Sequence, residues 1–129
     1  MAITIDDNIC TASTLPGSFY CDPQIYRDQL EKVFVPSWQF VVNQVDEGCA
    51  NPLSLLPGSL NEPLVLTKND DQTHCLSNVC THRAAIVVTE PGQLKTLRCG
   101  YHGRRFRLDG QFVSMPGFQG ACDFPSEKD

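Results

Sequence analysis

Two short motifs constrain this chain more than any other feature of its sequence. A C-x-H motif at residues 80–82 and a C-x-x-H motif at residues 99–102 each combine one thiolate with one imidazole, and sixteen residues lie between them. Each motif follows a predicted strand, so we expect two short rigid loops, residues 80–85 and 99–104, that the intervening segment brings together. Cysteine and histidine are common ligands of transition metals. The pattern therefore predicts a metal centre. Its four candidate ligands are Cys80, His82, Cys99 and His102.

Two kinds of centre fit these ligands. Tetrahedral zinc accepts two cysteines and two histidines, but structural zinc sites usually begin with a pair of cysteines about two to four residues apart. Here each loop mixes the two ligand types. A [2Fe–2S] centre with two cysteines on one iron and two histidines on the other suits two loops that each supply one of both. The sequence favours the iron–sulfur centre and leaves zinc as the alternative.

The chain has the size and composition of one globular domain, with one helix near its start. It holds 129 residues, of which 41% are hydrophobic and 19% charged. A helix is predicted over residues 23–35, with Asp22 as its cap, Pro23 in its first position and Pro36 at its end. Its apolar stripe consists of Tyr26, Leu30, Val33 and Phe34.

Short antiparallel strands account for most of the remaining pattern. They are predicted at residues 38–42, 53–56, 64–68, 73–77, 106–108 and 111–113. Residues 69–72 have the composition of a hairpin loop, and Asp109-Gly110 suits a type I′ turn. The fold class predicted is all-β with one N-terminal helix.

Four longer segments extend the pattern beyond the ligands. LSNVCTHRA at 76–84 and RCGYHGRRFRLDGQF at 98–112 surround the two motifs, and residues 15–41 and 115–125 flank them. Together they resemble the Rieske [2Fe–2S] domain at the N-terminus of the large (α) subunit of Rieske non-haem iron oxygenases, the aromatic-ring-hydroxylating type. The resemblance implies an antiparallel β-sandwich with a small two-loop cluster-binding subdomain. It places this domain at residues 19–125, between an N-terminal extension, 1–18, and a tail, 126–129.

Some positions differ from related patterns. Respiratory-chain Rieske proteins carry an extra cysteine in each loop and a serine after the second His-Gly, and this chain has neither, which predicts a potential toward the lower end of the Rieske range. The oxygenase family usually has Gly where Ala84 stands and Trp where Arg104 stands. Neither position is a ligand, so the expected cluster is unaffected, but the packing of the second loop is in question.

The resemblance implies one-electron transfer from a reductase or ferredoxin to a mononuclear iron held by two histidines and a carboxylate. The sequence has three histidines, and only His74 remains once the cluster ligands are assigned. In the family the catalytic domain follows the Rieske domain, so we expect the catalytic iron domain to be absent from these 129 residues and assign no catalytic residue here. The resemblance also implies that His102 is hydrogen-bonded to a carboxylate that bridges to the iron of a neighbouring subunit. A stand-alone Rieske-type ferredoxin is the alternative, and a zinc-stabilised binding module is a remote one. The substrate, and the choice between mono- and dioxygenation, are not encoded in this stretch.

Charge is unevenly distributed along the chain. The net charge is −5, which argues against nucleic-acid binding, yet residues 91–108 contain five basic residues and no acidic one. This stretch is either a solvated loop face or a docking surface for an acidic electron donor. The residues beside the ligands that are candidates for supporting them or for docking a partner are Arg83, Tyr101, Gly103, Arg104 and Arg105.

The remaining features predict a cytoplasmic protein with no membrane association. No apolar run approaches the roughly 18 residues that span a bilayer, and the first twelve residues lack the basic and apolar regions of a signal peptide. The five other cysteines are interpreted as small hydrophobic residues or free thiols. Trp38 is predicted to lie in the core, and His74 to have a structural role.

Overall fold

The computed structural model describes residues 4–41, 44–126 and 129. The chain divides into two units, Met1–Val41 and Val42–Asp129. Both metal-binding motifs belong to the second unit.

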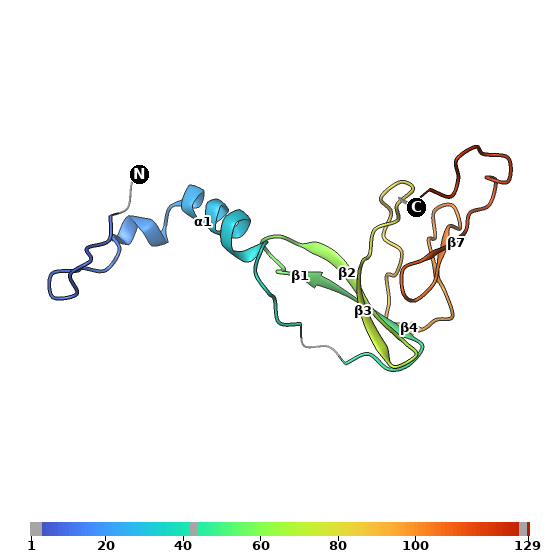
Figure 1. Ribbon diagram of the computed structural model, residues 1–129, viewed down its shortest axis with the longest axis horizontal. Coiled ribbons are helices and arrows are strands. Elements are labelled where there is room, and N and C mark those ends of the chain that lie inside the picture. The colour runs from blue at the N-terminus through green and yellow to red at the C-terminus, as the bar shows by residue number, and fades with distance from the viewer. Residues whose placement is uncertain (1–3, 42–43, 127–128) are drawn as a thin grey trace. The chain divides into compact units, whose positions relative to one another are not determined.

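The first unit contains the predicted helix. Its elements are η1 (Gly17–Tyr20, a 3-10 helix), α1 (Pro23–Gln29) and the π-helical turn η2 (Leu30–Phe34) (Figure 1). The Asp22 carboxylate accepts hydrogen bonds from the backbone N–H groups of Gln24 at 2.7 Å and Ile25 at 3.4 Å. These bonds satisfy two donors that have no partner inside the helix, which confirms the predicted cap.

Two expectations for the first unit are wrong. Trp38 is fully exposed instead of buried, and residues 38–41 form no strand, while Val42 lies outside the described residues. The apolar stripe of the helix is also open, since Val33 and Phe34 are 53% and 42% exposed. Aromatic and β-branched residues favour a strand only where a neighbouring strand offers a pairing edge, and none of the described strands pairs with this segment.

The second unit begins with a four-stranded antiparallel sheet. Its strands are β1 (Cys49–Leu55), β2 (Glu62–Asn69), β3 (Gln72–Ser77) and β4 (Gly92–Gln93), in the order β3-β2-β1-β4. The β2–β3 hairpin closes through Asp70 and Asp71, which both have positive φ, 51° and 61°. Two successive left-handed residues define the type I′ turn that matches strand twist. The hairpin predicted at residues 69–72 is confirmed.

A three-stranded antiparallel sheet follows, with strands β5 (Leu97–Arg98), β6 (Arg105–Phe106) and β7 (Phe112–Ser114). The turn between β6 and β7 is not type I′, because only Gly110, at φ 89°, is left-handed. Instead the Gly110 N–H donates to the Arg107 carbonyl at 3.1 Å, and the Arg107 N–H donates to the Gln111 carbonyl at 2.8 Å. Leu108 is buried and its carbonyl accepts from the Thr67 hydroxyl, so the chain is held to the core before it can reverse.

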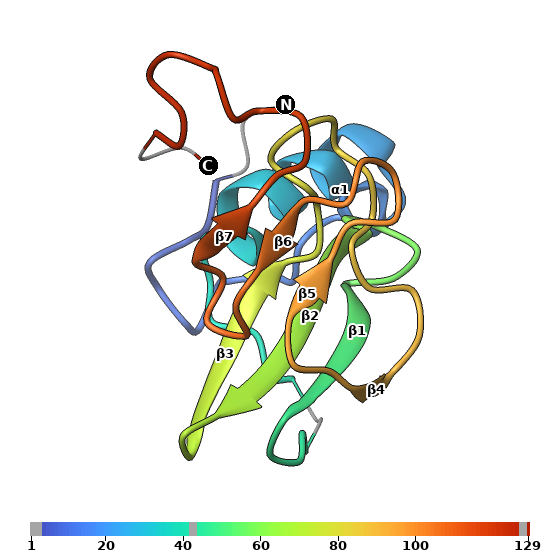
Figure 2. The same ribbon diagram turned by 90° about the vertical axis from the view of Figure 1, so that its right-hand side faces the viewer.

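The two sheets face each other across a common core (Figure 2). Ala50 and Val65 from the first sheet pack with Leu97 and Phe106 from the second. The cysteines of both motifs belong to the same buried cluster. The predicted all-β fold with antiparallel sheets and one N-terminal helical region is confirmed, and its core reaches directly to the metal-binding loops.

Candidate metal centre

The two motifs form loops with the same backbone hydrogen bonds. In the first loop the Cys80 N–H donates to the Ala85 carbonyl at 2.8 Å, and the Ala84 N–H donates to the Cys80 carbonyl at 2.9 Å. In the second loop the Cys99 N–H donates to the Arg104 carbonyl at 2.8 Å, and the Gly103 N–H donates to the Cys99 carbonyl at 3.0 Å. Each cysteine is thus fixed through both of its backbone polar groups.

The fourth residue after each cysteine is left-handed, which explains one departure in the sequence. Gly103 has φ 75° and Ala84 has φ 51°. Glycine adopts this conformation freely, whereas a residue with Cβ loses about 1–2 kcal/mol there. Ala84 therefore occupies a position that favours glycine, and the hydrogen bonds of the loop hold it in the less favourable conformation.

Asn78 closes the base of the first loop and was missed by sequence analysis. Its side-chain NH₂ donates to the Val88 carbonyl at 2.7 Å, and its side-chain oxygen accepts from the Val88 N–H at 2.8 Å. Asn78 is 3% exposed. A bridge between Val79 and Ile86 lies just inside this pair. An asparagine two residues before a predicted ligand loop gives no local signal, because its partner lies ten residues further along the chain.

The four candidate ligands separate into a buried pair and an exposed pair. Cys80 and Cys99 are 3% and 1% exposed, whereas His82 is partly exposed and His102 exposed. The two imidazole rings lie with their centroids 4.8 Å apart and their planes at 73°. Among residues 4–41, 44–126 and 129, no three cysteine, histidine or acidic side chains are grouped as one metal ion would need.

Backbone amides and neighbouring groups act on the two sulfurs. The N–H groups of His82 and Arg83 donate toward the Cys80 sulfur, but burial dominates and raises the pKa of its thiol. Burial also acts to raise the pKa of the Cys99 thiol, yet the N–H groups of Tyr101 and His102 lower it overall. The Cys80 thiol donates to the Cys99 sulfur, so the pair holds negative charge preferentially on Cys99.

The imidazole of His82 favours its neutral form. Desolvation lowers its pKa, and the nearby His102, Arg83 and Arg104 lower it further. A neutral imidazole has a free lone pair and is therefore ready to bind a metal. The exposed Tyr101 ring lies 3.7 Å from the His102 ring, between centroids, with their planes at 34°.

The basic residues near the second loop face in opposite directions. Arg105 and Arg107 are exposed, whereas Arg104 is 2% exposed and does not belong to the exposed basic surface where docking was expected. Burial alternates with exposure from Arg104 to Leu108, as it does along a β-strand. This period of two was the signal in the sequence that could have identified Arg104 as an inward-facing residue.

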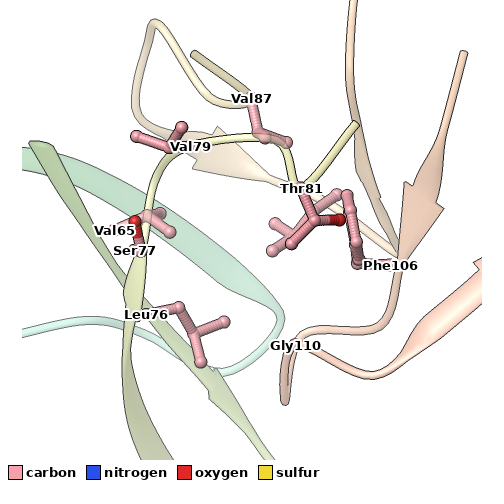
Figure 3. A pocket seen from close by; sticks show the side chains of 9 residues that line it. Val65, Leu76, Ser77, Val79, Thr81, Val87, Phe106 and Gly110 are labelled. Atoms are coloured by element: carbon pink, nitrogen blue, oxygen red, sulfur yellow. The ribbon is translucent and has the colours of Figure 1, made fainter. Parts of the chain in front are cut away.

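An apolar cavity of about 190 Å³ lies below the first loop (Figure 3). Thr81 of the loop and Val79 just before it line the cavity together with Leu76 of β3 and Phe106 of β6. Its lining contains hydroxyl groups but no cysteine, histidine or acidic residue. The cavity is distinct from the four candidate ligands and leaves space for the side chains around it to shift.

Comparison with known proteins identifies the class to which this fold and site belong. The family model that describes the Rieske [2Fe–2S] domain matches residues 38–125 of the sequence. The chain therefore belongs to the Rieske [2Fe–2S] domain family, which confirms the predicted family and its cofactor.

Particular relatives include oxygenases. The chain is 35% identical over 116 residues to choline monooxygenase of Amaranthus tricolor, covering 88% of this chain and 26% of the relative. It is 28% identical over 130 residues to the carnitine monooxygenase oxygenase subunit of Escherichia coli K12, covering 96% and 34%. The quaternary ammonium Rieske monooxygenase CntA with L-carnitine superposes with a TM-score of 0.78 at 24% identity, covering 91% and 34%. The chain thus spans about a quarter to a third of these relatives. No helix in the described residues is long and apolar enough to cross a membrane.

Proposed function

We propose that Cys80 and Cys99 hold one iron of a [2Fe–2S] cluster and that His82 and His102 hold the other. The separation of the ligands into a buried sulfur pair and an exposed imidazole pair is the observation that supports this assignment. The residues fit the group chemically, because the loop amides that donate to the sulfurs stabilise negative charge there. When bound, such a cluster supplies one-electron transfer.

We propose further that this chain is the electron-entry domain of a Rieske oxygenase. It would receive electrons from a reductase or ferredoxin and pass them to a mononuclear iron in a catalytic domain, in the same or a neighbouring subunit. Two observations support this function: the relatives are oxygenases several times longer than this chain, and His74 in β3 is the one histidine left for any second site. A cytoplasmic location completes the proposal.

Metal analysis of the purified protein tests the cluster directly. We expect two irons and two sulfides per chain, and loss of the Rieske spectrum when His102 is replaced by alanine. His74→Ala is the matched control and should keep the spectrum. Colourless protein that holds one zinc after anaerobic purification would refute the assignment, and so would a His102→Ala variant with an unchanged spectrum.

The length of the protein encoded by the natural gene separately tests the proposal that this chain belongs to an oxygenase. A reading frame that continues for several hundred residues, with two histidines and a carboxylate at iron-binding spacing, is expected. An encoded protein of 129 residues that carries the cluster would instead favour the stand-alone ferredoxin. Choline and carnitine, named for the relatives, are the substrates to test first in the full-length protein.

Two exposed arginines beside the second loop support an electron donor with an acidic surface. Arg98 and Arg105 are paired across β5 and β6 and are both exposed. Like charges placed opposite each other in a sheet destabilise it, so this pair has a cost that an anionic partner would offset. Lys95 and Arg107 instead line a surface pocket with Asp70 and Asp109, where acidic groups balance them. We therefore assign the docking of an acidic electron donor to Arg98 and Arg105.

Stopped-flow reduction by the cognate donor at several salt concentrations tests this docking surface. Arg105→Glu should slow reduction and weaken its dependence on salt. Lys68→Glu is the charge-matched control, because the strand register places Lys68 beside the β2–β3 turn, at the opposite end of the hairpin from the chain that enters the first loop. Equal rates for the two variants would remove the docking assignment without affecting the cluster assignment.

A further inference from the structure

Arg104 has surroundings that a solvent-exposed loop arginine does not have. Its guanidinium carbon lies 5.0 Å from the centroid of the Phe112 ring, 5.6 Å from that of Phe124 and 5.7 Å from that of Phe106. The guanidinium also forms an ion pair with the Asp129 carboxylate. Burying a charge is costly unless it is paired, and aromatic faces and a carboxylate provide that pairing here. We call Arg104, these three rings and Asp129 the arginine clamp.

The arginine clamp is linked to both metal-binding loops. On one side, the Arg104 carbonyl accepts the hydrogen bond from the Cys99 N–H. On the other side, the Phe124 ring lies 4.7 Å from the Phe118 ring, which contacts the His82 ring edge-on at 5.9 Å. The segment after β7 therefore connects a residue of the second loop to a candidate ligand of the first.

The charge of Arg104 acts on the centre itself. Arg104 follows the candidate ligand His102 by two residues, its carbonyl accepts the Cys99 N–H at 2.8 Å, and its side chain is 2% exposed, so a buried positive charge lies beside the second loop. One-electron reduction of a cluster at this place adds one negative charge. The Asp129 carboxylate that pairs with the guanidinium is more exposed, 17% against 3%, so solvent screens the negative charge more than the positive one. The less screened positive charge stabilises the reduced state more than the oxidised state.

We propose that Arg104 is a positioning residue that holds the aromatic segment against His82 and raises the reduction potential of the cluster. This inference rests on the proposed cluster ligands. It differs from the docking role expected for Arg104, because the residue acts from inside the domain and touches no partner. It also explains how the second loop packs without the tryptophan that the family usually has there.

Two measurements on the cluster-loaded protein test the proposal: the midpoint potential, from a redox titration followed by electron paramagnetic resonance, and the rate of iron release to a chelator. Arg104→Met should lower the potential and speed iron release. Arg104→Lys keeps the charge and should restore most of the potential, while iron release remains faster than in the wild type. Arg105→Met, a neighbouring exposed arginine, is the matched control for the loss of one positive charge.

Phe118→Leu keeps the charge and removes the aromatic contact with His82, so it tests positioning even if Arg104→Met fails to fold. We expect faster iron release from this variant with a potential close to that of the wild type. The proposal is overturned if Arg104→Met or Arg104→Lys matches Arg105→Met in both measurements, or if Phe118→Leu releases iron at the wild-type rate. A wild-type protein without iron and sulfide would instead overturn the cluster assignment and this inference with it.

Discussion

Replacing Asn78 with alanine is the most informative single perturbation of the metal-binding loops. The two hydrogen bonds to Val88, at 2.7 Å and 2.8 Å, join the strand before the first loop to the chain after it. Truncation leaves the N–H and C=O groups of Val88 without their partner, in a residue that is 5% exposed. The loop backbone would then lose its closure without any change in the ligands.

The magnitude follows from the number of groups left unpaired. A buried donor or acceptor that loses its partner costs about 1–3 kcal/mol, so two of them cost about 2–6 kcal/mol. Domains are stable by only about 5–15 kcal/mol, so Asn78→Ala should consume a large part of the free energy of unfolding. Asn51→Ala is the matched control: its side chain donates one long bond, 3.3 Å, to the Gln44 carbonyl at an exposed site. We expect its loss to stay within about 0.5 kcal/mol.

Hydrogen exchange and urea unfolding of the cluster-loaded protein measure the effect locally and globally. In Asn78→Ala the Val88 amide should lose protection by at least tenfold, since about 1.4 kcal/mol corresponds to a factor of ten. Iron content should fall during purification as the loop opens. If Asn78→Ala and Asn51→Ala unfold with the same free energy, and the Val88 amide stays protected, the closing role of Asn78 is refuted.

Three further predictions concern backbone conformation and pH. Gly110→Ala, at φ 89° and with its new methyl 3.1 Å from Leu76 Cδ2, should lower the free energy of unfolding by about 2–4 kcal/mol. Its control is Gly58→Ala, at φ 84° in open space, which should lower the free energy of unfolding by about 1–2 kcal/mol. Equal losses for the two variants in thermal unfolding would contradict the contribution of packing against Leu76. Ala84→Gly removes the cost of a positive φ, 51°, at a residue with Cβ and should raise the free energy of unfolding by up to about 1 kcal/mol. The cluster spectrum should not change. A lower free energy of unfolding in the same assay would show that the loop does not strain this residue. The pKa of Asp129 is lowered from 3.8 to about 2, by the Ser126 N–H and then by the guanidinium of the clamp, so its stabilisation is complete above pH 3.8 and disappears as the pH falls toward 2. Asp129→Asn should therefore be less stable than the wild type at neutral pH and approach it in acid, and a difference that does not vary with pH would contradict the ion pair.

Local features of this chain were predicted from sequence because their causes act over a few residues. The helix begins at Pro23 since Asp22 caps it. The second ligand loop begins at Cys99 directly after β5, and the first begins at Cys80, three residues after the end of β3. The kinds of donor, two thiolates and two imidazoles, are likewise a property of the sequence alone. The donor pattern predicted a metal centre, and the resemblance of the surrounding segments to Rieske domains implied the family, the cofactor and the fold.

Turn geometry was predicted less well because it depends on what the neighbouring strands do. The β2–β3 hairpin lies where the composition of residues 69–72 predicted a hairpin loop, and its type I′ geometry, which was not predicted, arises because two consecutive residues were free to adopt positive φ. At Asp109-Gly110 the predicted type I′ turn was wrong, because the buried Leu108 ties the chain to Thr67 of the other sheet. A long-range contact therefore decided a local conformation.

The burial of individual side chains was decided mainly by the tertiary structure, although the alternation from Arg104 to Leu108 was a local indication of it. Five basic residues in one stretch predict an exposed basic surface, yet the ring of Phe112 in the neighbouring strand and that of Phe124, twenty residues further along the chain, enclose Arg104. Trp38 shows the opposite outcome, because no described element of its unit covers it. The sequence by itself determined which groups can bind a metal and where the loops lie. The packing of segments distant in sequence decided which charge lies beside them, because burial and electrostatic interaction depend on distance in space and not on separation along the chain.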